Sequence, residues 1–179
     1  MLYSVLHNEL WQTPLPFTSL SHEQFVKLQQ ASAKQTIEGL VMGALIRNNV
    51  KLERADALLA YSRTMMIEQL NRKVNAVAKE LATILANDDI DYRIFKGQTL
   101  ALLYPHPETR MPGDIDFYCV PNHFARAQQL LQKAWGITLG GEESMQHRRC
   151  LSRAWLSTRF RPRSMCFTPF CISIIIWWN

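Results

Sequence analysis

Hydrophobic residues recur every three or four positions through most of the first half of the chain, which is the spacing of one face of an α-helix. Ser21 precedes the first clear segment of this kind, and Gln24 follows it by three residues, a pairing typical of a capping box at a helix start. We therefore predict a helix over residues 22–34. A second helical segment covers residues 35–49, and a long one covers residues 52–86.

The apolar face of the long helix is a stripe whose members are mostly three or four residues apart. Its members are Leu59, Met66, Leu70, Val74, Val77, Leu81 and Ile84. Sustained heptads would be needed to indicate a coiled coil, and the stripe does not supply them. We interpret it as the face that packs on the helix's own domain, with an intermolecular seam as the alternative. We expect Met65 and Met66 in the core.

The pattern changes after the sequence "NDD", where the segments become shorter and alternate. The expected order is a strand, a glycine turn with a short helix, a loop, a second strand and an amphipathic helix, over residues 90–95, 96–105, 106–113, 114–120 and 123–136. Helices followed by a β-α-β-α order indicate an α+β domain behind a helical N-terminal layer. We place the helical N-terminal region at residues 1–88 and the core domain at residues 89–147.

The charge of the chain is unevenly distributed, and this limits what its net value of +5 means. Residues 1–147 carry 14 Lys and Arg against 15 Asp and Glu, a net charge of −1. Residues 148–179 carry six Arg and no acid, a net charge of +6. A phosphate-binding surface normally mixes Lys with Arg on an amphipathic element, and this tail does neither. Nucleic acid is therefore not an expected partner.

The tail over residues 148–179 also differs from the rest of the chain in its aromatic and cysteine content, with three of the five Trp and three of the four Cys. We interpret it as an anomalous basic and apolar tail in a non-native reading frame. The alternative is a genuine segment that contacts RNA or a membrane. On the frameshift interpretation, truncation after His147 leaves the domain stable.

The cysteines and the hydropathy pattern bear on the cellular compartment. The four cysteines form no CxxC pair and no disulfide framework, which is typical of a reduced protein. The sequence shows no signal peptide and no apolar run long enough to span a bilayer. We expect a cytoplasmic protein without a membrane partner.

The strongest chemical signal is the pair of aspartates in "RMPGDIDFY". Alternate residues of a strand share a face, so Asp114 and Asp116 point one way while Ile115, Phe117 and Cys119 point inward. Two carboxylates on one strand face can hold a hard cation such as Mg²⁺. The alternative is a solvated strand end with no ligand.

The residues before this pair indicate a site that binds an anion. Gly97 follows Lys96 at a strand-to-helix turn, where backbone N–H groups and the positive end of a helix attract negative charge. Lys96 and Arg110 are then placed to neutralise phosphate.

The segment "FKGQTLALLYPHPETRMPGDIDFYCV" resembles the signature of the uncharacterised nucleotidyltransferase family, within the DNA polymerase beta-like superfamily. The resemblance covers about residues 52–147. It implies a nucleotidyltransferase-like mixed sheet, with Asp114 and Asp116 as catalytic metal ligands for Mg²⁺. It also implies transfer of a nucleoside monophosphate from an NTP, expected to be ATP, to an unidentified acceptor. The nucleotide-binding residues that it implies are Lys96, Gly97, Gln98, Arg110 and Gly113.

Two departures from the family pattern put the activity of this chain in question. The usual Gly-Ser of the superfamily is Gly97-Gln98 here. The third carboxylate, which a later strand normally supplies, is missing, because no acid follows Glu143 and the adjacent Glu142 lies with it in a polar turn. We expect a Mg²⁺-dependent enzyme that is incomplete in this chain. The alternatives are an inactive module of the same fold that binds a nucleotide or a protein, and a chance D-x-D pair.

Overall fold

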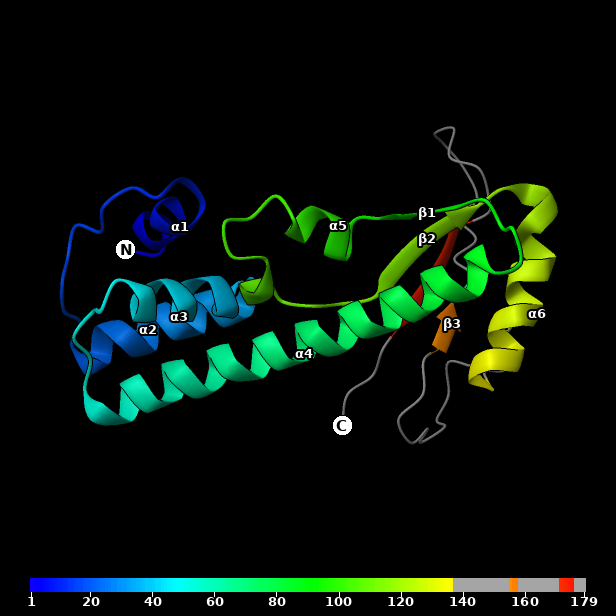
Figure 1. Ribbon diagram of the computed structural model, residues 1–179. Helices are drawn as coiled ribbons and strands as arrows, with labels where there is room; N and C mark the ends of the chain where they lie inside the picture. Colours follow the sequence, from blue (N-terminus) through cyan, green and yellow to red (C-terminus); the bar gives the residue numbers. More distant parts are fainter. Residues whose placement is uncertain (137–154, 158–170, 176–179) are drawn as a thin grey trace. The chain divides into compact units, whose positions relative to one another are not determined.

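A computed structural model describes residues 1–136, 155–157 and 171–175 of the chain (Figure 1). The chain divides into two compact units. We call residues 1–73 with 101–112 the helical unit, and residues 74–100 with 113–179 the sheet unit.

The helical unit is built from three complete helices, the first part of a fourth and one 3-10 turn. These elements are α1 (Leu2–Trp11), α2 (His22–Lys34), α3 (Glu38–Arg47), α4 (Arg54–Ala86) and η1 (Pro107–Thr109). Their apolar faces enclose a core whose largest fully buried members include Phe25, Leu28, Met42 and Leu45.

The predicted start of α2 is confirmed in detail. The Gln24 N–H donates to Ser21 Oγ at 3.3 Å, and the Ser21 N–H donates back to Gln24 Oε1 at 3.0 Å. Both bonds of a capping box are therefore present, and they satisfy two backbone donors that the first turn leaves without helical partners.

Helix α4 has the predicted extent within two residues at its start, but its buried face is not the predicted one. Leu59, Met65 and Met66 are 39%, 40% and 42% exposed, so the expectation of core methionines is wrong. In that half of the helix the fully buried apolar residues are Ala60 and Ile67.

The reason for this error is that two polar residues belong to the buried face. Thr64 and Asn71 are 6% and 2% exposed, and each donates to a carbonyl one turn earlier in the helix. Buried polar groups with hydrogen-bond partners are stable in a core. A stripe traced through apolar residues alone skips both positions and therefore follows a neighbouring face. Val74 and Leu81, further along, are buried as predicted.

In the sheet unit, the described residues form four strands and, besides the second part of α4, three helical segments. The strands are β1 (Tyr92–Phe95), β2 (Ile115–Cys119), β3 (Trp155–Ser157) and β4 (Cys171–Ile175), and the other elements are α5 (Gly97–Ala101), η2 (Pro121–His123) and α6 (Phe124–Trp135). The strand order is β1-β2-β4-β3 (Figure 1). All three pairings among the described strands are antiparallel, where the family resemblance implied a mixed sheet. The short α5 and the loop after it do not form the crossover that a parallel neighbour requires.

The core of the sheet unit lies between β2, α6 and the second half of α4. Ile115, Phe117 and Cys119 are at most 2% exposed, as the alternation along β2 predicts. They pack with Leu81 of α4 and Leu131 of α6, among others. Helix α6 ends as predicted at a left-handed glycine, Gly136.

The α+β class is thus confirmed, while the unit boundaries differ from a single division near residue 88. The continuous α4 runs through residue 73, where the helical unit gives way to the sheet unit, and the chain returns to the helical unit over residues 101–112. Two short strands of the tail, β3 and β4, join the sheet. The rest of residues 148–179 lies outside the described residues. That the tail is read in a non-native frame stays a prediction. No helix in the described part of the chain combines the length and apolar content needed to cross a membrane.

Candidate functional site

The antiparallel pairing of β1 with β2 brings the predicted glycine turn beside the aspartates. Phe95, the last residue of β1, lies opposite Asp116 in the register. The chain then turns at Lys96 and Gly97, which have φ angles of 57° and 24°. A Cβ atom on Gly97 would lie 3.2 Å from the Asp114 carbonyl oxygen, closer than side-chain carbons normally approach. The structure therefore brings together the two segments that the sequence placed in one site.

The two aspartates differ sharply in their surroundings. Asp114 precedes the first residue of β2 and is exposed, whereas Asp116 lies within the strand and is 7% exposed. Burial of an ionised carboxylate is costly unless a cation or hydrogen-bond donors compensate it. At Asp116 a cation is present: the Nζ atom of Lys96 lies 3.3 Å from Oδ2. The Lys96 side chain is itself mostly exposed and also lies over the Phe95 ring, 5.2 Å from its centroid.

This donor set fits a hard divalent cation. Carboxylate oxygens are the ligands that Mg²⁺ prefers, and it commonly takes one or two of them while water and substrate phosphates fill its other positions. Asp116 supplies a carboxylate that already faces a positive charge, and Asp114 supplies an exposed one two residues away. The cationic side chain of Lys96 marks a place where a positive charge is stabilised.

Two other predicted nucleotide-binding residues, Gln98 and Gly113, differ in their contacts with the rest of the protein. Gln98, on α5, donates through Nε2 to Asn75 Oδ1 at 2.6 Å, a contact with α4 that sequence reasoning missed. A Cβ atom on Gly113 would meet nothing within 4 Å, so no protein atom requires glycine there.

Arg110 lies in the helical unit, in the loop after η1. Its Nη1 donates to the Met111 carbonyl at 3.1 Å, and its own carbonyl accepts from Asn71 Nδ2 at 2.6 Å. The backbone keeps it four residues from Asp114, so their Cα atoms are at most about 14 Å apart.

Sequence reasoning missed a second group of potential metal ligands, in the helical unit. One ligand atom from each of His22, Glu53 and Asp56 lies within 4.8 Å of the others. The His22 Nδ1 is 3.1 Å from both oxygens of the buried Asp56. No sequence signal links them, because His22 and Glu53 are 31 positions apart, and the three residues meet only where the start of α2 lies beside the start of α4. A purely structural role for Asp56 also fits, since a carboxylate in the first turn of α4 interacts favourably with the helix dipole.

A third carboxylate beside the two aspartates would complete the family pattern. Among the described residues, the His22 group is the one set of three such side chains found within that distance. Asp114 and Asp116 are therefore not joined by a third carboxylate, histidine or cysteine from the part of the chain that the structure describes. Glu142 and Glu143 lie outside the described residues.

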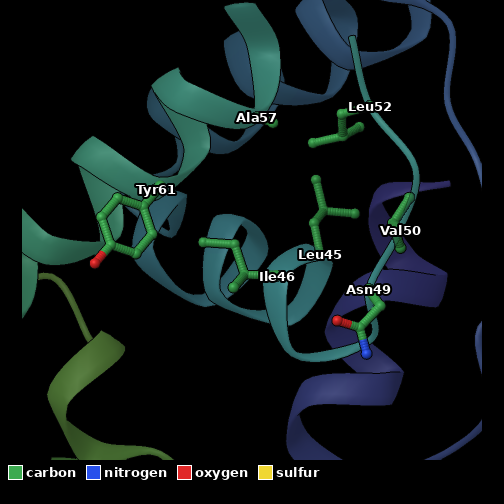
Figure 2. Close-up of a pocket in the computed structure, with 7 residues that line it drawn as sticks. All are labelled: Leu45, Ile46, Asn49, Val50, Leu52, Ala57 and Tyr61. Atoms are coloured by element: carbon green, nitrogen blue, oxygen red, sulfur yellow. The ribbon is translucent and has the colours of Figure 1, made fainter. Parts of the chain in front are cut away.

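A separate cavity of about 370 Å³ lies in the helical unit (Figure 2). It is lined by Leu45, Ile46, Asn49, Val50, Leu52, Ala57 and Tyr61. Neither a carboxylate nor a basic group is among these residues, so the cavity lacks the charges that a metal–triphosphate complex needs.

Two further titratable groups of the sheet unit lie outside the candidate site. Burial raises the pKa of the Cys119 thiol, so this inward-facing cysteine stays protonated at neutral pH and is a poor nucleophile. The hydrogen bonds from Arg126 lower the pKa of Asp88. Neither group is part of the candidate site.

Comparison with known families matches residues 21–159 to the family described as "uncharacterised nucleotidyltransferase". The match spans more than half of the chain. It begins about 30 residues earlier than the resemblance read from the sequence and includes β3 as well as the whole candidate site. Neither a curated protein nor a solved structure matches the chain.

Proposed function

The chain belongs to the uncharacterised nucleotidyltransferase family, and on this basis we propose that it binds a Mg²⁺–NTP complex at Asp114 and Asp116 and transfers the nucleoside monophosphate to an acceptor. The observation that carries the proposal is the convergence at one end of the β1–β2 pair. There a buried carboxylate, an ammonium group and a glycine turn meet within hydrogen-bonding or van der Waals distance.

Each residue of the site has a role in this proposal. Asp114 and Asp116 hold the cation, which supplies charge neutralisation for the phosphates and polarises the phosphorus that is attacked. The Gly97 turn lets the nucleotide approach the backbone closely, and the ammonium of Lys96 pairs with a phosphate oxygen. Arg110 binds phosphate in the same manner, and Gln98 and Gly113 border the nucleotide.

The proposed donor is ATP, and the proposed setting is the cytoplasm. The acceptor is a molecule with a nucleophilic group such as a hydroxyl, and nucleic acid is not the expected one. The charge distribution supports this, since residues 1–147, which contain the site, carry a net charge of −1, and the net positive charge of the chain comes from residues 148–179.

A second function has a specific observation in its favour. In the described part of the chain no third carboxylate, histidine or cysteine joins the two aspartates, and nucleotidyl transfer by two cations needs more ligands than one pair supplies. The site would then bind Mg²⁺–NTP without turning it over, as an inactive nucleotide-binding module.

One assay separates the enzyme from the inactive nucleotide-binding module. The full-length protein is incubated with Mg²⁺ and ATP labelled at the α-phosphate, and both pyrophosphate release and retention of label on protein or added small acceptors are followed. The enzyme proposal expects release that disappears in Asp116→Asn. Saturable binding without release supports the module, and the absence of both binding and release contradicts the two proposals together.

A further inference from the structure

A histidine and two carboxylates meet in the helical unit, where the start of α2 lies beside the start of α4 (Figure 1). His22 is the first residue of α2, Glu53 directly precedes α4, and Asp56 lies in the first turn of α4. One ligand atom from each residue lies within 4.8 Å of the others. All three residues belong to the helical unit, so this group is complete within one compact part of the chain.

Asp56 is the buried member of the group, and its carboxylate is only partly compensated. It is 4% exposed, and both of its oxygens lie 3.1 Å from the same atom, His22 Nδ1. A ring nitrogen carries at most one proton, which cannot form a full hydrogen bond to each of two oxygens. An imidazole is also charged only when it is protonated, so His22 does not supply a permanent positive charge.

The other buried carboxylates of the helical unit each have an arginine partner. Glu9, which is 3% exposed, pairs with Arg47, and Glu38, which is 7% exposed, lies 3.6 Å from Arg63 Nε. Among the described residues, no Lys or Arg forms such a pair with Asp56. Burial of an ionised carboxylate is costly without a cation, and the dipole of α4 offsets only part of that cost. A bound cation at Asp56 would supply the missing charge.

His22 and Glu53 can complete the coordination of such a cation. The His22 side chain is 62% exposed, and the exposed carboxylate of Glu53 has no hydrogen-bond or ion-pair partner in the described part of the chain. Ligand atoms bound to one ion at about 2.1 Å lie about 3.0–3.4 Å apart when adjacent and about 4.2 Å apart when opposite. The spacing between His22 Nδ1 and Asp56 already fits, and a small rotation of the exposed side chains brings Glu53 within reach.

We propose that His22, Glu53 and Asp56 form a binding site for a divalent transition-metal ion, of which Zn²⁺ is the representative. Imidazole is a typical ligand of such ions, whereas Mg²⁺ takes oxygen ligands. His22 Nδ1 must be unprotonated to coordinate, so the ion takes the place of a proton there. Three protein ligands leave a further position for water. The proposal is independent of the proposed function and of the Mg²⁺ site at Asp114 and Asp116.

Titration of Zn²⁺ into the untagged full-length protein tests the site. Calorimetry compares wild type with His22→Gln, Glu53→Gln and Asp56→Asn, in an excess of Mg²⁺ that occupies sites with oxygen ligands alone. We expect each substitution to weaken Zn²⁺ binding at least about tenfold, because each removes one ligand. Wild-type affinity in His22→Gln or in Glu53→Gln would overturn the proposal, and so would the absence of Zn²⁺ binding in wild type.

The matched control is His106→Gln. His106 Nδ1 also faces a carboxylate, at 3.7 Å from Glu108 Oε1, but no third such ligand joins them among the described residues. This variant should bind Zn²⁺ as wild type does. Glu53→Gln separates a metal site from a purely structural contact, because Glu53 has no part in the hydrogen bond between His22 and Asp56. If Asp56→Asn does not fold, His22→Gln and Glu53→Gln, which alter exposed side chains, decide the question.

Two further measurements identify the coordinating atom and the consequence for stability. In nitrogen-15 NMR of the histidine rings, the Nδ1 resonance of His22 should shift on addition of Zn²⁺, while that of His106 should not. Zn²⁺ should raise the melting temperature of wild type and not of His22→Gln, because an ion that binds only the folded state stabilises it. A His22 Nδ1 resonance that does not respond to Zn²⁺ would overturn the site.

Discussion

The ammonium group of Lys96 lies 3.3 Å from a carboxylate oxygen of the buried Asp116, in the antiparallel pair formed by β1 and β2. This contact compensates part of the cost of burying the ionised carboxylate. A divalent cation at Asp116 would compete with it, and the displaced Lys96 would be free to approach a phosphate oxygen. Cation binding and phosphate binding would then be coupled through one side chain.

Lys96→Met tests this coupling. We expect the affinity for Mn²⁺ alone, measured by electron paramagnetic resonance, to rise several-fold because a competing charge is removed, while the affinity for Mg²⁺–ATP falls about tenfold through loss of a charge-assisted contact. Lys133→Met, which neutralises an exposed lysine of α6, is the matched control and should change neither. Weaker Mn²⁺ binding in Lys96→Met would contradict the coupling.

Gly97 and Gly113 form a natural comparison at the two ends of the site. Gly97 has a φ of 24°, and a Cβ atom there would lie 3.2 Å from the Asp114 carbonyl oxygen. Gly97→Ala should therefore cost about 1–2 kcal/mol of unfolding free energy. The Cβ atom added in Gly113→Ala has no atom within 4 Å, so this variant should lose less than about 0.5 kcal/mol of unfolding free energy. Urea unfolding of both variants measures this, and equal stabilities would show that the turn is not constrained as described.

At the start of β2, the structure predicts a large loss of stability at one residue and almost none at the residue before it. Ile115 is 2% exposed within the core, and Ile115→Asp places an unpaired charge there at a cost of several kcal/mol, on the order of the stability of a domain. Asp114→Ala removes an exposed side chain and should leave the unfolding free energy within about 0.5 kcal/mol of wild type. Circular dichroism and soluble yield compare the two. A folded Ile115→Asp variant would contradict the assignment of the buried face.

The Asp88–Arg126 pair gives a prediction about acid stability. The Nε and Nη2 atoms of Arg126 donate to the two oxygens of Asp88 at 2.6 and 2.7 Å, and these bonds hold the pKa of Asp88 below its ordinary value of 3.8. A carboxyl group with a lowered folded-state pKa stabilises the fold above its unfolded pKa, and this contribution is lost as the pH falls through the folded pKa.

Asp88→Asn should therefore melt at a lower temperature than wild type at pH 7, and the gap should persist down to about pH 5 and close below about pH 4. Melting curves across this range provide the measurement. A gap that widens in acid would mean that the pair does not stabilise the charged form of Asp88.

Much of the fold follows from local sequence signals. The capping residues of α2, the glycine that ends α6 and the inward-facing apolar residues of β2 each depend on neighbours within a few residues, and all are found as expected. The phase of α4 was misjudged because Thr64 and Asn71 are buried through partners that the helix and the loop supply. A polar residue in a stripe carries no sign of such a partner.

The candidate site likewise combines contacts that the local sequence predicts with contacts that it does not. Residues 95–120 hold the glycine turn and the aspartates in one continuous segment, so their meeting could be inferred from two short strands. Other contacts join residues that are 23 to 39 positions apart in the chain. They are the hydrogen bond of Gln98 with Asn75, the hydrogen bonds from Asn71 to the carbonyls of residues 108 and 110, and the group around His22. These depend on how helices pack, which spacing along the chain does not encode.

In the proposed function, Asp114 and Asp116 bind the cation of a Mg²⁺–nucleotide complex. Calorimetric titration of ATP into the full-length protein, with and without Mg²⁺, tests it in wild type, Asp114→Asn and Asp116→Asn, with Asp88→Asn as a control acid outside the site. We predict Mg²⁺-dependent binding in wild type and Asp88→Asn, and a loss of at least about tenfold, equivalent to about 1.4 kcal/mol, in each of the other two. Equal affinities in all four proteins would show that the two aspartates do not bind the nucleotide complex and would rule out the proposed site.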